Sequence, residues 1–144
     1  MRNITRAMNL PTPKARLANC VWLPRILAKA RLLQRGELPP GYAERFCHPT
    51  GVDRLFLNHF HLQREDIVAA AGRTDEEVAA WFTARPAGRA ESIAHWNDTA
   101  LNLGRPGYPL AERLPIAKTT VYKNVDSTGM TTVFELLEAD DRLS

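Results

Sequence analysis

The sequence predicts an all-α fold, a single compact domain of five to six helices. Apolar residues recur at three- and four-residue spacing over several segments, which is typical of helices with one buried face. Capping residues and Pro/Gly breaks bound these segments at lengths normal for globular helices. Only residues 116–125 have strand character, from Thr119, Thr120, Val121 and Tyr122, and no partner strand for them is evident.

The first helix is predicted to begin near Leu23 and to end at Gly36. Pro24 falls in its first turn, where the missing N–H costs nothing, and Gly36 suits the left-handed residue that often follows a helix. Trp22 lies just before the helix and is expected to pack back on it. Four residues at helical spacing should face the core: Ile26, Leu27, Ala30 and Leu33.

The middle of the chain predicts three further helices. After a Pro/Gly break over residues 36–42, helices are expected at about 52–60 and 64–71. Thr74 and Glu77 then form the capping-box pattern, so another helix should begin after Thr74. The expected core residues of these helices are Leu55, Phe56, Phe60, Val78, Trp81 and Phe82.

The last third of the chain predicts two helices separated by a connector. The first covers about 90–103, and the second begins after Thr131 or Thr132, either of which can cap it. Between them, residues 104–115 are rich in proline and glycine and allow one helical turn at most. The expected core residues here are Ile93, Trp96, Ala100, Leu103, Val133, Phe134 and Leu137.

Domain organisation follows from the prolines and the chain length. Pro11 and Pro13 disfavour helix nearby, so residues 1–13 are expected to form a flexible N-terminal arm and residues 14–144 one helical domain. The two cysteines are too few for a disulfide framework and fit a reducing compartment. No apolar run approaches the length of a membrane span. Cytoplasmic localisation without membrane association is therefore expected.

Positive charge is concentrated at the N-terminal end. Residues 1–36 contain eight basic side chains, whereas all 16 acidic side chains lie after residue 36. Such a split marks either an anion-binding segment or a basic helix that packs beside acidic residues of the same chain. The second alternative places Asp98 or Glu91 against the first helix. Asn97 and Asp98 are poor helix-interior residues, which suggests specific partners for their side chains.

No catalytic or metal motif stands out. Cys47, His48, His59 and His61 are metal-ligand residue types, but His59 and His61 are two positions apart and point in different directions from a helix. The sequence contains no glycine-rich phosphate loop and no nucleophile elbow. The expectation is therefore no metal site, no identifiable catalytic residue and no cofactor.

Five segments, taken in order, form a recognisable pattern: "VWLPRILAKAR", "TGVDRLFLNHF", "RTDEEVAAWF", "HWND" and "TTVFELLEADD". Together they resemble the bacterial family named domain of unknown function 5069, over about Lys14 to Arg142. The Trp-Leu-Pro-Arg opening at Trp22 with the following Lys-Ala-Arg is the most specific piece. Family members often have Gly-Tyr where this chain has Asn19 and Cys20. The resemblance implies a self-contained bacterial domain and brings no activity, substrate or cofactor.

The predicted function is a non-catalytic helical module that binds a protein partner or a small anionic ligand. The amides of a helix N-terminus bind anions, and Arg25 lies in the first turn with Lys29 one turn further on and Trp22 alongside. Asp53 and Arg54, at the start of the second helix, complete or neutralise this pocket. The predicted ligand-binding residues are therefore Trp22, Arg25, Lys29, Asp53 and Arg54.

Two alternatives stay open. A small enzyme would anchor a carboxylate or phosphate substrate with arginine and lysine and use His59, His95 or Asp53 for proton transfer. A nucleic-acid binder would use the basic N-terminal segment, and this is the less favoured alternative because no stacking aromatics are interleaved with the charges.

Overall fold

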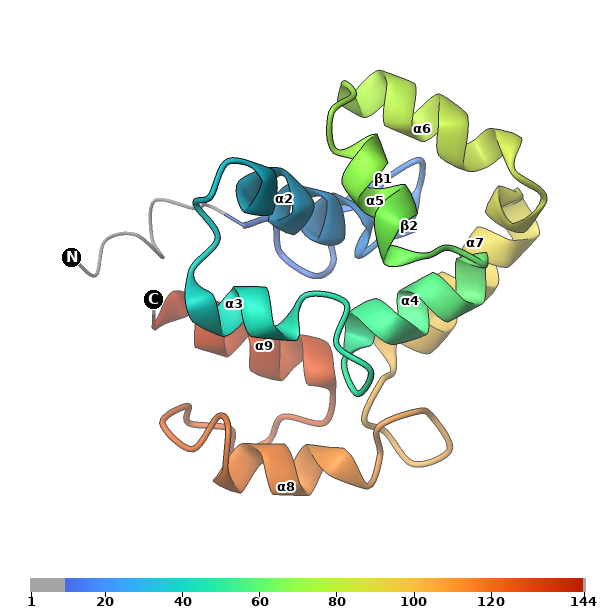
Figure 1. Ribbon diagram of the computed structural model, residues 1–144. Helices are drawn as coiled ribbons and strands as arrows, with labels where there is room; N and C mark the ends of the chain where they lie inside the picture. The colour runs from blue at the N-terminus through green and yellow to red at the C-terminus, as the bar shows by residue number, and fades with distance from the viewer. Residues whose placement is uncertain (1–9, 144) are drawn as a thin grey trace.

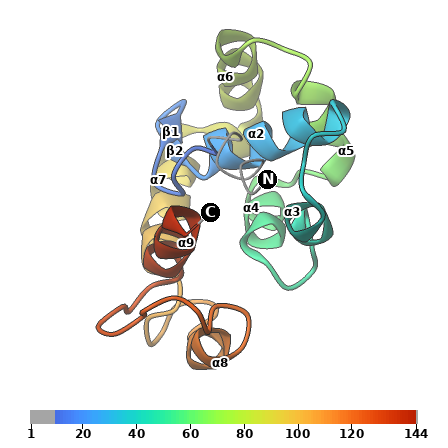
Figure 2. The same cartoon turned by 90° about the vertical axis from the view of Figure 1, so that its left-hand side faces the viewer.

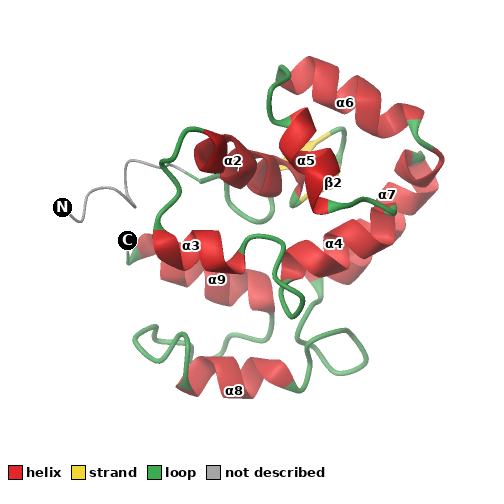
Figure 3. Cartoon of the chain, in the orientation of Figure 1, coloured by secondary structure: helices red, strands yellow, loops and turns green. Residues whose placement is uncertain are grey.

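A computed structural model describes residues 10–143 and confirms a mostly helical fold (Figures 1 and 3). This part of the chain contains eight α-helices, more than the five to six expected, together with a hairpin of two very short strands. The elements are β1 (Arg16–Leu17), β2 (Cys20–Val21), α2 (Leu23–Gln34), α3 (Pro40–Arg45), α4 (Val52–Phe60), α5 (Arg64–Ala70), α6 (Asp75–Ala84), the 3-10 turn η1 (Pro86–Gly88), α7 (Ala90–Leu101), α8 (Arg113–Thr119) and α9 (Val133–Arg142).

The helices with clear start and stop signals lie where the sequence predicts them. Helix α2 carries its proline in the first turn and is followed by Gly36 at φ 70°, a left-handed conformation that favours glycine. Helix α6 begins with the expected capping box, in which Thr74 Oγ1 accepts from the Glu77 amide and the Glu77 carboxylate accepts from the Thr74 amide. The same arrangement at Thr132 and Glu135 starts α9.

Two helices form where the sequence analysis expected other structure. Helix α3 begins inside the Pro/Gly break, with Pro40 in the first turn, where a proline is tolerated. Helix α8 covers part of the stretch expected to be extended, so the strand prediction for 116–125 is wrong. No partner strand is present for its β-branched residues in the described chain, and they lie at the end of α8 and in the turns that follow it.

The hairpin was not predicted. Strands β1 and β2 pair antiparallel with Leu17 opposite Cys20, and the two turn residues between them, Ala18 and Asn19, have positive φ angles. Helix α7 holds this turn in place. The Asn97 side chain accepts from the Val21 amide at 3.0 Å and donates to the Asn19 carbonyl at 2.8 Å. Asn97 therefore has the specific partners that its position in a helix suggested.

The main core is a cluster of aromatic and aliphatic side chains on α2, α4, α6 and α7. Phe56 is its centre: its ring lies 4.9 Å from Phe60, 6.1 Å from Phe82 and 5.4 Å from Trp96, between ring centroids. All four rings are fully buried or nearly so. Edge-to-face and offset packing of this kind stabilises a core beyond the area it buries.

Helix α8 belongs to a second, smaller cluster. Figures 1 and 2 place α8 at one end of the molecule, beyond α9. The apolar contacts there come from four buried residues, separate from the main core: Leu114, Val125, Leu136 and Ala139. Gly104, at φ 97°, lies where the chain leaves α7; a Cβ on it would come within 3.0 Å of the Leu114 side chain and 3.3 Å of the Val133 amide.

Most of the expected N-terminal arm, residues 1–9, lies outside the described residues. Residues 10–13 contact the domain. The Pro11 carbonyl accepts from Arg25 Nη1 at 3.0 Å, and Thr12 Oγ1 donates to the Glu138 carboxylate at 2.9 Å. This end of the chain is therefore attached to α2 and α9.

Candidate functional site

A buried carboxylate, Asp53, organises the region where the sequence analysis placed a ligand site. It lies in the first turn of α4 and is only 2% exposed. Lys29 Nζ donates to both of its oxygens, at 3.0 and 2.9 Å. Trp22 Nε1 donates to Oδ1 and the Cys47 amide to Oδ2, each at 2.8 Å. Every contact that a buried carboxylate needs is thus supplied from within the chain.

Arg25 makes a second buried ion pair next to the first. It is 3% exposed and forms a bidentate contact with Asp141 on α9, at 2.8 and 3.0 Å. Its Nη1 also donates to the Pro11 carbonyl. The paired guanidinium fork and carboxylate have matched geometry, which fixes the C-terminal helix against α2.

The Trp22 ring lies between the two ion pairs. It stacks on Phe134 of α9 at 5.5 Å, with Lys29 Nζ 4.9 Å and Arg25 Cζ 5.6 Å from its centroid. Cations over an indole face are attracted by its quadrupole. Trp22 has φ 76°, in the left-handed region where a side chain is strained, so the hydrogen bond to Asp53 and the stacking must hold it there.

The remaining charges of α2 are also paired inside the chain. Arg31 Nη1 contacts Asp75 at 2.8 Å and the same side chain donates to the carbonyls of Ala71 and Arg73. Arg35 contacts Glu37. The basic helix therefore pairs with acidic residues of its own chain, as one of the two alternatives proposed. The expected partners were wrong, because Asp98 lies by the Tyr108 hydroxyl and α2 uses other carboxylates: Asp53, Asp75, Asp141 and, next to its C-terminus, Glu37.

The structure brings together four of the five residues predicted to bind a ligand. Trp22, Arg25, Lys29 and Asp53 form one network, but they satisfy one another or Asp141 and are buried. An anion placed there would have to displace a carboxylate already held at ideal distance. Arg54 is the exception: it lies on the outer side of α4, partly buried, and donates from Nη2 to the Cys47 carbonyl at 3.3 Å.

Burial dominates the electrostatics of this region. It lowers the pKa of Lys29, although Asp53 opposes the shift. It raises the pKa of Cys47 to about 11, with a further contribution from Asp53, and that of Cys20 to about 12. Both thiols are therefore protonated near neutral pH and are poor nucleophiles.

His59 and His95 lie side by side, on α4 and α7. His59 stacks on His95 at 5.6 Å with the rings nearly parallel, and its Nε2 lies 2.9 Å from the Ser92 carbonyl and 3.1 Å from Ser92 Oγ. In the tautomer whose Nε2 carries the proton, this nitrogen donates to the carbonyl and cannot take a proton from the serine. The sequence analysis missed this Ser–His contact, because Ser92 and His59 are 33 residues apart.

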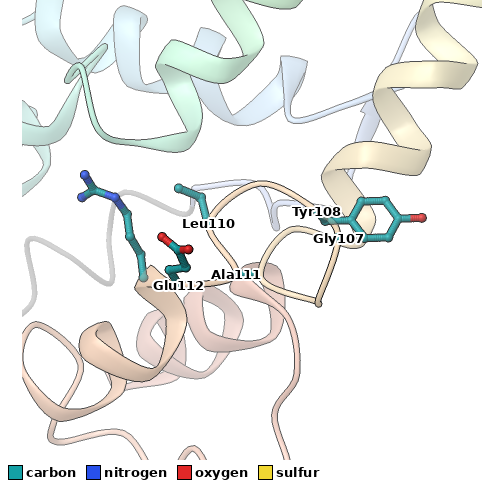
Figure 4. A pocket seen from close by; sticks show the side chains of 6 residues that line it. Gly107, Tyr108, Leu110, Ala111 and Glu112 are labelled. Atoms are coloured by element: carbon teal, nitrogen blue, oxygen red, sulfur yellow. The ribbon is translucent and has the colours of Figure 1, made fainter.

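No three His, Cys, Asp or Glu side chains within residues 10–143 gather in an arrangement that would hold a metal ion. A hollow of about 350 Å³ lies on the segment that leads into α8, lined by residues 107–113. Figure 4 shows the Tyr108 ring pointing away from the Glu112 carboxylate. The hollow is open and lacks the enclosed walls that small-molecule sites use.

Apolar exposure is concentrated around α8. Ile116 is 62% and Val121 73% exposed, whereas the aliphatic residues of α2 and α4 mostly face the core. Basic side chains accompany them, since residues 105–123 contain a single acidic residue, Glu112, and four basic ones: Arg105, Arg113, Lys118 and Lys123.

The fold and these features define a small helical domain whose central charges are internally paired. The profile of the family described as domain of unknown function (DUF5069) matches residues 8–143, so the chain belongs to this family, as the resemblance indicated. Comparison with curated proteins gives no match. Within the described residues no helix is both long and apolar enough to cross a membrane.

Proposed function

We propose that this protein is a non-catalytic helical module that binds an acidic protein partner through α8 and the turn after it. The observation that carries the proposal is the exposure of Ile116 and Val121 on one short segment. Ile116 and Val121 are five positions apart, and exposed aliphatic side chains that gather on one surface often mark a contact site. Burying them in an interface would remove an unfavourable exposure.

The charge around this surface favours an acidic partner. Arg113 and Lys123 are exposed beside the aliphatic residues, and neither takes part in an ion pair of the described chain. Basic residues at the rim of an apolar contact speed association with an acidic surface and set its orientation. A cytoplasmic location, expected from the sequence, is compatible with this role and stays a prediction.

The enzymatic and nucleic-acid alternatives receive less support. Within residues 10–143, the serine–histidine contact shares His59 Nε2 with the Ser92 carbonyl, which favours the tautomer that cannot abstract a proton, and the thiols are buried and protonated. Five of the six basic side chains that the structure describes in the N-terminal segment have carboxylate partners, which reduces the charge free to contact phosphates. The five are Lys14, Arg25, Lys29, Arg31 and Arg35.

The test compares proteins recovered with the wild-type chain and with an Ile116→Asp/Val121→Asp variant by affinity purification and mass spectrometry. We expect at least one acidic protein to be lost with the variant and retained with Leu143→Asp, a control at an equally exposed aliphatic residue, 63% exposed. The purified partner should then bind the wild type directly and bind Arg113→Glu more weakly. If the same proteins are recovered with the wild type and with both variants, the proposal is refuted. It is also refuted if the double variant loses only its self-association, because the surface would then bind a second copy of this chain.

A further inference from the structure

Residues 104–132, between α7 and α9, form an excursion of the chain whose two ends are tied together. The Leu103 carbonyl accepts from the Val133 amide at 2.8 Å, so the chain returns to the point where it leaves α7. The excursion contains α8 and lies at one end of the molecule, with α9 between α8 and α2 (Figures 1 and 2). Because its ends are joined, the excursion can change position without moving α7 or α9.

Residues 111–130 of this excursion are hydrogen-bonded among themselves. Lys118 Nζ donates to the Met130 carbonyl at 2.7 Å and joins α8 to the end of the turns that follow it. Backbone bonds close these turns, for example the bond from the Tyr122 amide to the Ala117 carbonyl at 2.9 Å. We call residues 111–130 the flap, because these bonds hold them together as one body.

The flap has few polar contacts with the rest of the described chain. The Leu110 carbonyl, directly before the flap, accepts from the Arg113 and Leu114 amides at the start of α8. None of the ion pairs among the described residues includes a flap residue. The hydrogen bonds of flap side chains to described residues all stay inside the flap. Polar contacts therefore do little to hold the flap on the molecule.

Helix α9 is attached to the main core by contacts of its own. Asp141 forms the bidentate pair with Arg25 of α2, and Phe134 stacks on Trp22 with ring centroids 5.5 Å apart. Neither contact uses a flap residue. Helix α9 therefore stays on the main core when the flap moves.

An apolar contact between the flap and α9 keeps the flap closed. Four buried side chains form it: Leu114 and Val125 on the flap, and Leu136 and Ala139 on α9. The Tyr122 ring packs against the same cluster, and burial raises the pKa of its hydroxyl, with a further contribution from Asp140 of α9. A contact of this size opens at a lower free energy than a main core that extends over most helices.

The backbone on either side of the flap has the conformations of a hinge. Gly104, Gly107 and Leu110 precede it with φ angles of 97°, 87° and 69°, and Gly129 lies near its other end with φ 79°. Glycine adopts positive and negative φ about equally, so these positions allow the backbone to turn. Leu110 is strained at its φ and packs against the main core, which fixes the start of the flap.

We propose that the flap detaches from α9 as one unit, turning about Gly104 and Gly129, and uncovers an apolar face of α9 while the main core stays folded. The flap carries Ile116 and Val121, which are already exposed when it is closed, so opening enlarges the apolar surface of this end of the molecule. The motion does not depend on the proposed partner, and its test uses the protein alone.

The test measures how fast a thiol reagent reaches positions that the closed flap buries. Ala139→Cys places a thiol on α9 and Val125→Cys places one on the flap, in separate proteins, at positions that are both 8% exposed. The chain's own Cys20 and Cys47 are buried in the main core and report its opening in the same molecules. Labelling with N-ethylmaleimide is followed by mass spectrometry, and each rate is divided by the rate of the same thiol in concentrated urea.

One opening should expose both introduced thiols. We therefore expect the normalised rates in Val125→Cys and Ala139→Cys to agree within a factor of about two. Both rates should exceed those of Cys20 and Cys47 by about ten-fold or more, because the main core opens at a higher free energy.

A glycine substitution at the hinge should change the rate in a known direction. In the Ala139→Cys background, Gly104→Ala should speed labelling about ten-fold, because the added Cβ would lie 3.0 Å from the Leu114 side chain when the flap is closed. Gly36→Ala is the matched control. Its φ of 70° is also left-handed, but nothing lies within 4 Å of the added Cβ, and it should leave the rate of this thiol unchanged.

Three outcomes would overturn the proposal. If the introduced thiols react no faster than Cys20 and Cys47, α9 is uncovered only when the whole protein unfolds. If the rates in Val125→Cys and Ala139→Cys differ by about ten-fold or more, the segment frays and does not move as a unit. Equal acceleration by Gly36→Ala would mean that backbone strain anywhere loosens the fold. The first two outcomes decide the proposal even where Gly104→Ala fails to fold.

Discussion

Two segments of this protein carry four basic side chains each, and the molecule uses them in opposite ways. In α2 and its C-cap, every cation has a carboxylate partner. In residues 105–123, none of the four is in an ion pair of the described chain, and large aliphatic side chains are exposed among them. The charge content of a segment therefore does not reveal whether its cations are paired within the chain. The position of the acidic residues in three dimensions decides this.

The two segments also differ in what supports them. Helix α2 lies against the main core, which extends over most helices, and its contacts reach α4, α5, α6 and α9. Helix α8 rests on a cluster of four buried residues. A region with few buried contacts opens more readily than one in the main core, which suits a surface that must adapt to a partner.

The largest expected change in stability comes from breaking a buried ion pair, and breaking an exposed pair should have a much smaller effect. Lys29→Met should lower the free energy of unfolding by ~3–5 kcal/mol, because Asp53 would remain buried without its cation. Arg35→Met, which breaks a pair whose side chains are 58% and 59% exposed, should change it by less than ~1 kcal/mol. Urea denaturation followed by tryptophan fluorescence measures both. Equal losses would show that burial does not distinguish these pairs.

A second prediction tests whether the α8 segment opens separately. Leu114→Ala should cost ~2–3 kcal/mol locally, because it removes a main member of the small cluster. Hydrogen exchange should accelerate over residues 104–130 and stay unchanged in α2, since the two segments belong to different clusters. Faster exchange in both segments by the same factor would mean that they unfold as one unit.

The third prediction concerns Asp141 on α9, the partner of Arg25. Asp141→Asn should destabilise the fold by ~1–3 kcal/mol, because the buried Arg25 loses the charge of its bidentate partner. Thermal unfolding at pH 7 measures this change. An unchanged melting temperature would mean that the Pro11 carbonyl and the Trp22 ring suffice to hold Arg25.

The smallest expected change in stability is a gain, and it concerns Asp140 on α9. Burial and Asp141 raise the pKa of Asp140 above its ordinary value of 3.8, so its ionised form costs stability in the folded state. Asp140→Asn should therefore stabilise the protein at pH 7 by less than ~1 kcal/mol. The gain should vanish as the pH falls below 3.8, where the wild-type carboxyl is neutral as well. A gain that persists at low pH would have to come from packing instead of charge.

Local signals predicted the helices well. The capping box at Thr74 and Glu77 and the glycine after α2 are short-range patterns whose physical effect is also local. The hairpin was missed because strands of two residues leave no alternation to detect. The stretch after Pro115 was assigned to a strand from β-branched residues alone, although β-propensity depends on a neighbouring strand that does not exist in the described chain.

Four of the residues named for the candidate site, Trp22, Arg25, Lys29 and Asp53, lie together in the structure, and their role as a ligand site stays a prediction. The sequence could not show that Asp141, 116 residues from Arg25, completes the pairing. Contacts between distant residues depend on the tertiary structure, which short-range patterns do not encode.

The hydrogen bonds of the Asp53 carboxylate also constrain the order in which parts of the chain dock during folding. Its donors come from the residue before α2, from about two turns further along that helix, and from the loop before α4. Water must leave this carboxylate when α4 docks, and the loss of hydration is offset only if all three donors are already in place. A partly docked intermediate with one donor missing is therefore penalised. We expect α2 and α4 to reach their final contact late and together, in a single cooperative step.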